Sequence, residues 1–182
     1  MYEINTKIKS VCPYIQNKPE EKEWVVGPDG NWTIKNPPGT VGKKSVNPED
    51  AGWKDEKGYF IPSGQIFGAM RERSGGIKLG KGKMTLKNLF ISCVRIEPDK
   101  IYLNKKKPDR IYDKPCFKPT RSGGEMVFTP RPMFDSFEVK IKIVVLEDSI
   151  PKEAIMECLK NAGLYQGIGS RRPLYGRFMV VS

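Results

Sequence analysis

Residues 137–145 (FEVKIKIVV) carry the clearest secondary-structure pattern of the chain. Apolar residues alternate there with Glu138, Lys140 and Lys142. A period of two residues predicts a strand with one face toward a core and the other toward solvent. We expect this strand to extend over 134–146 and to form part of the central sheet.

A helix and then a glycine-rich loop are expected after this strand. The helix is predicted to have Ser149 as its N-cap, Pro151 in its first turn and Gly163 at its end. The next segment, 165–178 (YQGIGSRRPLYGRF), contains three glycines and three arginines and leads into a last strand expected over 177–181. The apolar residues of the helix have the i, i+3, i+4, i+7 spacing of a buried stripe: Ile155, Cys158, Leu159 and Ala162.

Three further elements are predicted upstream. Residues 1–11 alternate in the same way as the central strand and predict a first strand. A helix is expected over 63–74, capped by its first residue, and Gly64 and Gly68 would make one side of it thin enough for close packing. The apolar run 89–96 predicts a buried strand.

The resulting order is βαββαβ, which predicts an α+β fold with a ferredoxin-like sheet and helices on one face. We expect a single domain over 1–182. A long insertion or arm occupies 12–58 after the first strand, and an irregular loop occupies 99–131 between the second and third strands. Within this loop, 101–112 is expected to form an irregular hairpin. The sheet face opposite the helices is expected to be free, and single nucleic-acid strands commonly lie there in this architecture.

Composition favours a polyanionic partner and restricts the chemistry. The net charge is +11, which points to nucleic acid first and to a membrane surface second. The chain has no histidine, so Ser-His and Cys-His nucleophiles are excluded and a zinc site is disfavoured. No apolar run reaches the ~18 residues of a membrane span. We expect the protein to bind no metal and no cofactor and to be located in a reducing cytosol.

The segment 165–178 is the first candidate site. Gly167 and Gly169 can direct backbone N–H groups toward an anion, and Tyr165 and Tyr175 can stack on bases. The loop is neither a P-loop nor a dinucleotide fingerprint, because no Gly-Lys-Ser/Thr follows it and it lies between a helix and a strand. Its positive charges come from Arg171, Arg172 and Arg177. The two adjacent arginines can point apart, which leaves a structural role for one of them as the alternative.

Other basic and aromatic groups provide weaker candidates. A flexible basic loop can follow a phosphate backbone without reading sequence, and the alternative is a solvated surface. The acids Asp109, Asp113 and Asp135 show no metal-ligand spacing and are expected in salt bridges and turns. Trp24, Trp32 and Trp53 are expected to form a small core of the insertion, with base stacking as the alternative. The basic residues expected to form the other side of a strand-binding track are Arg71, Arg73, Lys78, Lys81 and Lys83.

Three segments resemble the RAMP superfamily, the RRM-like proteins of CRISPR effector complexes, and above all their backbone subunits. They are 60–71 (FIPSGQIFGAMR), 131–137 (RPMFDSF) and 167–178 (GIGSRRPLYGRF). The chain is also similar to short, solitary proteins of this type that phages and prophages encode. The resemblance implies an RRM-like domain in which the two insertions take the place of finger or thumb elaborations. It also implies a cytoplasmic location, as for a viral or prophage protein acting in its host.

The function implied by the resemblance is non-catalytic, largely sequence-independent binding of single-stranded nucleic acid, with RNA favoured over DNA. The subunits would associate as a homo-oligomer or filament along the strand. Two alternatives remain open: a metal-independent endoribonuclease that uses Tyr or Lys in place of His, and a phage protein-interaction component such as an inhibitor of CRISPR complexes. The contacts implied by the matching motifs are Gly167, Gly169, Ser170, Arg171, Arg172 and Arg177, with Arg71 from the first helix.

Overall fold

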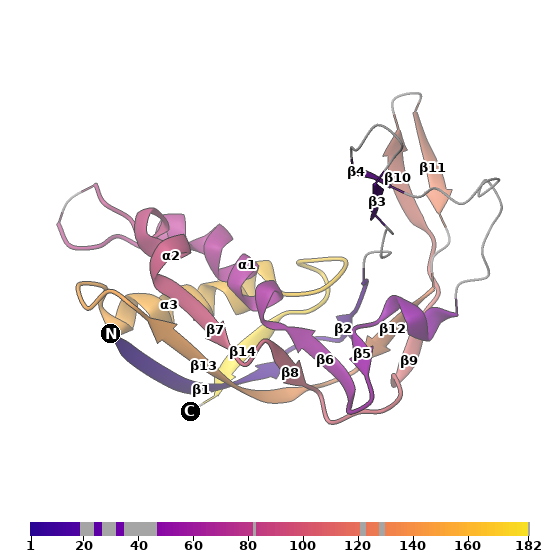
Figure 1. The fold of residues 1–182 in the computed structure, drawn as a ribbon, viewed down its shortest axis with the longest axis horizontal. Coiled ribbons are helices and arrows are strands. Elements are labelled where there is room, and N and C mark those ends of the chain that lie inside the picture. Colours follow the sequence, from indigo (N-terminus) through magenta and orange to yellow (C-terminus); the bar gives the residue numbers. More distant parts are fainter. Residues whose placement is uncertain are drawn as a thin grey trace.

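The computed structural model describes residues 1–18, 24–26, 32–34, 47–81, 83–120, 123–127 and 130–181. A four-stranded antiparallel sheet lies at its centre (Figure 1). The strand order is β14–β1–β13–β7, which is the 4-1-3-2 order of a βαββαβ unit and confirms the expected ferredoxin-like α+β fold. The strands are β1 (Tyr2–Ser10), β7 (Val94–Glu97), β13 (Glu138–Val145) and β14 (Phe178–Val181).

The alternating patterns of β1 and β13 place these two strands side by side. Their register runs from Tyr2 opposite Val145 to Lys9 opposite Glu138. Ile4 and Ile8 of β1 are buried, as are the alternate apolar residues of β13. Burial of each such side chain contributes about 1.5–3 kcal/mol, so this pair of strands is a main source of stability.

Two helices, α1 (Ser63–Arg73) and α3 (Lys152–Asn161), cover one face of the sheet (Figure 1). Both occur where the sequence predicted them, but neither has a side-chain cap, because Pro62 and Pro151 occupy the N-cap positions. The predicted capping by Ser63 and by Ser149 is therefore wrong. The side chains that these helices bury are Ile66, Ala69 and Met70 of α1 and Ala154, Ile155, Cys158 and Leu159 of α3.

Gly163 does not end the second helix, contrary to prediction. The chain continues as a π-helical turn, η3 (Ala162–Gln166). A Cβ at Gly163 would lie 2.2 Å from the carbonyl oxygen of Phe178. Glycine is therefore needed here for the helix to pack against β14.

The strand predicted over 89–96 is wrong for its first half, which is helical. Residues Lys87–Cys93 form α2, and only the second half of the run continues as β7. Phe90 is fully buried, whereas Ile91 is 66% exposed. The run is short and apolar, and periodicity alone does not separate a buried strand from a helix in such a run.

Smaller sheets extend the domain beyond the central one. In one, β6 lies between β5 and β8; in another, β12 lies between β2 and β9. The predicted hairpin over 101–112 is wrong, because its strands pair with β6 and β12 and not with each other. The strand expected over 134–146 is likewise two strands, β12 and β13. The bounds are β2 (Tyr14–Ile15), β5 (Lys54–Asp55), β6 (Gly58–Pro62), β8 (Lys100–Tyr102), β9 (Arg110–Tyr112) and β12 (Arg131–Phe134).

Two hairpins rise from the end of the molecule where β9 and β12 lie (Figure 1). One joins β3 (Trp24–Val26) to β4 (Trp32–Ile34), and the other joins β10 (Cys116–Thr120) to β11 (Gly123–Val127). The side chains of Trp24 and Trp32 are outside the described part of the structure. Two short 3₁₀ helices complete the fold, η1 (Pro48–Ala51) and η2 (Ser74–Gly76).

Several described residues within 12–58 pack against the rest of the domain. Tyr14 and Ile15 are fully buried, and the Gln16 side chain donates to the Phe60 carbonyl at 2.9 Å. The ring of Trp53 lies 6.3 Å from that of Phe60 of β6. Trp53 thus contributes to the packing around β6. In the described ranges, no helix has the length and apolar character required to cross a membrane.

Candidate nucleic-acid interface

A groove of about 340 Å³ lies between α1 and the C-terminal loop 167–177, and we call it the α1 groove. One wall is a face of the helix, and the other is the loop that the sequence singled out. Its lining residues are Asn17, Gly64, Gln65, Gly68, Glu72, Gly169, Ser170 and Arg172.

The helical wall of the α1 groove is open at its two glycines. Gly64 and Gly68 are four residues apart and so lie on the same face of α1. A Cβ built at either position would have no described atom within 4 Å, apart from the helix's own backbone and the adjacent residues. No described residue therefore makes the close packing that the two glycines would allow. Glycine inside a helix is less favourable than alanine by about 0.5–1 kcal/mol, and described neighbours provide no compensating contact.

Two glycines of the loop have no room for a side chain. Gly169 has φ +78°, and a Cβ there would lie 2.4 Å from the Ile15 carbonyl oxygen. Gly176 has φ +75°, and its Cβ would lie 1.8 Å from the Ile168 carbonyl oxygen. These distances show that the loop is packed tightly against its own chain.

Several backbone N–H groups of the loop already have partners. The N–H of Gly167 donates to the Ala162 carbonyl at 2.8 Å, and that of Ser170 donates to Ile15 at the same distance. The predicted use of the Gly167 N–H to hold an anion is therefore wrong. Positive charge on this wall comes from side chains.

The adjacent arginines Arg171 and Arg172 point in different directions. Arg171 is half-buried, donates to the Pro115 carbonyl at 3.4 Å, and has its guanidinium 5.7 Å from the centre of the Tyr112 ring. Arg172 is exposed, lines the α1 groove and lies 4.0 Å from a carboxylate oxygen of Glu72. Arg171 thus holds the loop in place, and Arg172 faces the groove.

The two arginines of α1 differ in the same way. Arg73 donates to the Tyr165 carbonyl at 3.1 Å and to the Gln166 side chain at 3.2 Å, so it fixes the turn after α3. Arg71 is exposed, and its side chain has no hydrogen bond or ion pair with any described residue. Because it is three residues after Gly68, it lies beside the groove wall.

The aromatic residues of the loop are in two environments. Tyr165 is 60% exposed, with the Arg73 guanidinium 5.8 Å from its ring centre. Tyr175 is half-buried, and the edge of its ring packs against Tyr112, with ring centres 5.6 Å apart. Tyr165 is therefore available for stacking, whereas Tyr175 mainly supports the loop.

Arg131 supports the candidate site, a role that its sequence context does not indicate. Its guanidinium donates to the Ser170 hydroxyl at 2.7 Å, so β12 holds the loop at the groove. The pairing with an acid that is common for arginine is absent among the described neighbours of Arg131. Asn17, Gln65 and Glu72 also line the groove, and local sequence carries no signal for their position.

The remaining basic candidates lie elsewhere. Lys78, Lys81 and Lys83 are exposed on the loop after η2, beyond the C-terminal end of α1 and at the end of the molecule away from the tip of the C-terminal loop (Figure 1). They do not line the α1 groove, so they do not form its other side. Arg177 is exposed just before β14 and also does not line the groove. Whether these residues contact nucleic acid stays a prediction.

Two of the three acidic residues considered in the sequence, Asp109 and Asp135, are engaged in polar contacts. Asp109 accepts from Lys105 and from the backbone N–H of Asp135, and Asp135 pairs with Arg110. The hydrogen bond from Lys105 contributes to holding the pKa of Asp109 below its ordinary value, against the opposing effect of burial. Across the described ranges, no three acidic or cysteine side chains come together as a metal site.

No protein-family model and no curated protein matches the chain. Among solved structures, the chain is similar to one in the "Cryo-EM structure of the Type III-B Cmr-beta bound to cognate target RNA". The identity is 13% and the TM-score 0.46, and the match covers 98% of this chain and 59% of that one. The present chain thus spans less than two thirds of that chain's length. A likeness at this level carries no argument about function.

Proposed function

We propose that the chain binds single-stranded nucleic acid in the α1 groove, without strong sequence preference and without catalysis. The observation that carries this proposal is the open glycine wall. Gly64 and Gly68 weaken α1, and no described part of the chain packs against them. A strand whose sugar–phosphate backbone lies close to the helix would use this space, because only glycine leaves room for so close an approach.

The charges around the groove support a phosphate ligand. The Arg71 side chain has no described partner, and Arg172 has a 4.0 Å contact with Glu72, the single acid among the described residues that line the groove. Exposed pairs of this kind contribute little, so Arg172 can exchange Glu72 for a phosphate at small cost. Guanidinium groups bind phosphate oxygens in a bidentate manner.

The size and charges of the groove favour binding of a single nucleic-acid strand with little recognition of its base sequence. A volume of about 340 Å³ accommodates a nucleotide-sized group, which excludes a duplex from the floor of the groove. Phosphate contacts position a strand without reading its bases. The exposed Tyr165 beside the loop can stack on a base of any type. We further propose that RNA is favoured over DNA and that several copies associate along one strand, as the family resemblance implies.

The test is fluorescence anisotropy with labelled oligonucleotides of equal length: poly-U and poly-A RNA, the corresponding DNA, and a duplex. We expect similar affinities for the two RNA sequences, weaker binding of DNA and the weakest binding of the duplex. Arg172→Gln should weaken binding to every sequence alike. The control is Lys152→Gln, the same charge change on the exposed first residue of α3. Duplex binding as tight as single-strand binding, or no binding at about 50 mM salt, would contradict the proposal.

The same samples separate this function from its alternatives. Labelled structured RNA should remain intact after long incubation, whereas an endoribonuclease would cut it. Size-exclusion chromatography with oligonucleotides of increasing length should show more protein per strand as the length grows. A constant ratio of one protein per strand would contradict the proposed association along the strand.

A further inference from the structure

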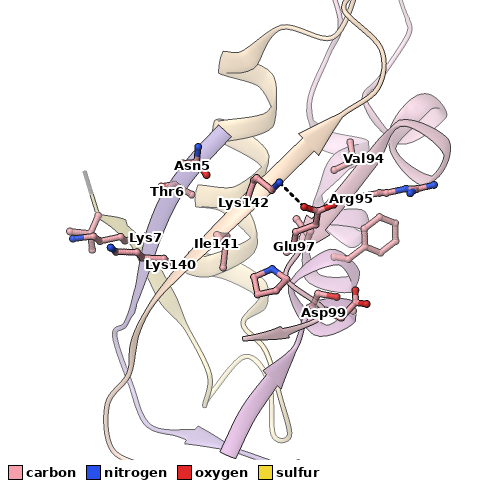
Figure 2. A pocket seen from close by; sticks show the side chains of 16 residues that line it. Asn5, Thr6, Lys7, Val94, Arg95, Glu97, Asp99, Lys140, Ile141 and Lys142 are labelled. Carbon is pink, nitrogen blue, oxygen red and sulfur yellow. Dashed lines mark ion pairs between the residues drawn. The ribbon is translucent and has the colours of Figure 1, made fainter. Parts of the chain in front are cut away.

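A second cavity, of about 1190 Å³, opens on the sheet face that the helices do not cover (Figure 2). Residues of β1, β7 and β13 line it, and it extends past the end of β7 to the first turns of α1. It shares only Gly64 with the α1 groove. The two sites can therefore be tested independently, and the inference does not depend on the proposed function.

Two lysines lie directly opposite each other at this cavity. Lys7 of β1 and Lys140 of β13 are register partners, and their side chains lie next to each other in Figure 2. Neither forms an ion pair with a described residue. Like charges at directly opposite positions on a sheet destabilise it. An anion held between the two ammonium groups would remove this repulsion.

The neighbouring acids do not neutralise this pair. Lys142, one row along the sheet, forms an ion pair with Glu97 at 2.7 Å and one with Glu3 at 3.3 Å, and these contacts raise its pKa. The dashed line in Figure 2 marks the contact with Glu97. Lys7 and Lys140 are therefore two adjacent cations without a neutralising acid among the described residues, whereas Arg95, which also lines the cavity, points away from them in Figure 2.

The other lining residues suit a compact ligand with one charged end. Phe67, Pro98 and Val181 contribute apolar surface, and Asn5 and Ser63 contribute polar groups. A volume of about 1190 Å³ slightly exceeds the roughly 300–1,000 Å³ of small-molecule sites, so there is room for a ligand of nucleotide size. An inorganic anion alone would leave most of this volume empty.

A long nucleic-acid strand fits this face less well. The described side chains that point outward from the four central strands include no aromatic residue on which successive bases could stack. Glu97 and Asp99 also line the cavity and would repel a continuous phosphate backbone.

We propose that this cavity binds a phosphomonoester of nucleotide size. The phosphate lies between the Nζ atoms of Lys7 and Lys140, and the apolar part of the ligand lies toward Phe67 and Pro98. The two ammonium groups provide charge-assisted hydrogen bonds to the phosphate, and the apolar surface provides the additional affinity that a bare phosphate lacks.

The test is calorimetric titration of the full chain with three probes: adenosine 5′-monophosphate, adenosine and inorganic phosphate. We expect the monophosphate to bind most tightly, and Lys7→Gln and Lys140→Gln each to weaken it roughly tenfold or more. The control is Lys9→Gln, on the same face but opposite Glu138. Equal binding of the monophosphate and adenosine, unchanged binding by the double variant, or no binding of the monophosphate by the wild-type chain would overturn the proposal.

Oligonucleotide affinity shows whether this site and the α1 groove are separate. The Lys7→Gln/Lys140→Gln variant should bind a single strand as well as a charge-matched Lys152→Gln/Lys160→Gln variant does. The Arg172→Gln variant should bind adenosine 5′-monophosphate as tightly as the wild type does. If the Lys7/Lys140 variant instead lost oligonucleotide affinity beyond its charge-matched control, the face would be part of the strand path and the phosphomonoester proposal would be wrong.

Discussion

Replacing Gly68 by alanine should make the protein more stable. Gly68 is in the middle of α1, and a Cβ there has no described atom within 4 Å. The substitution therefore has no steric cost and gains the difference in helix propensity, about 0.8–1.0 kcal/mol. For a chain of this length, that gain raises the melting temperature by about 2–4 °C.

Gly163→Ala is the matched contrast, because the same chemical change is made where space is absent. Its Cβ would lie 2.2 Å from the Phe178 carbonyl oxygen, so this variant should melt at a lower temperature than the wild type. Calorimetry or circular dichroism measures both changes. A lower melting temperature for Gly68→Ala would refute the reasoning, because it would show that something packs against this face.

The larger substitution Gly68→Leu tests why the glycine is present. Its side chain would enter a groove of about 340 Å³ and occupy the space proposed for the strand. We expect the variant to fold with near wild-type stability and to bind a single-stranded oligonucleotide at least roughly tenfold more weakly, a loss typical of a blocked contact. Wild-type affinity in the folded variant would show that the strand does not lie against α1.

Three other predictions concern the loop and the core. Gly176→Ala should lower the free energy of unfolding, measured by urea denaturation, by about 2 kcal/mol or more, because a Cβ at φ +75° would lie 1.8 Å from the Ile168 carbonyl oxygen. Stability equal to that of the wild type would contradict this. Arg131→Gln removes the hydrogen bond to Ser170 and should lower the free energy of unfolding by about 1–2 kcal/mol in the same assay. Combined with Ser170→Ala, the two losses should not add, and additive losses would show that the two side chains do not interact. Burial raises the pKa of the Cys158 thiol and of the Tyr59 hydroxyl to about 12, so the folded chain keeps protons that the unfolded chain loses at lower pH. The free energy of unfolding should therefore be at its full value below pH 9 and fall as the pH rises toward 12. No loss of stability over this range would contradict the burial of these groups.

The framework of the fold could be predicted because its central elements have regular patterns. The alternation in β1 and β13 and the apolar stripe of α3 each indicate one structure, and their order leads to the ferredoxin-like sheet. The prediction of a strand over 89–96 failed because a short apolar run fits a strand and a helix equally well. Burial of Phe90 and exposure of Ile91 depend on the neighbouring α1, which local sequence does not reveal.

Several residues of the candidate segment have structural roles that differ from those expected from the sequence. The loop 165–178 does line a groove, yet Gly169 and Gly176 serve the packing of the loop itself. Gly64 and Gly68, predicted to pack closely, are the open ones. The difference lies in what stands opposite each glycine, and that depends on contacts between distant parts of the chain. The role of Arg131 could not be predicted for the same reason, since its partner is 39 residues away.

The most direct test of the account is the salt dependence of oligonucleotide binding. The logarithm of the affinity for a single-stranded RNA is measured against the logarithm of salt concentration for the wild type and for Arg71→Gln, Arg172→Gln and their double variant. Each phosphate contact contributes a slope of about −0.7 for a single strand, so each substitution should make the slope shallower by about that amount. A flat wild-type response, or a double variant with the wild-type slope, would contradict phosphate binding at the α1 groove.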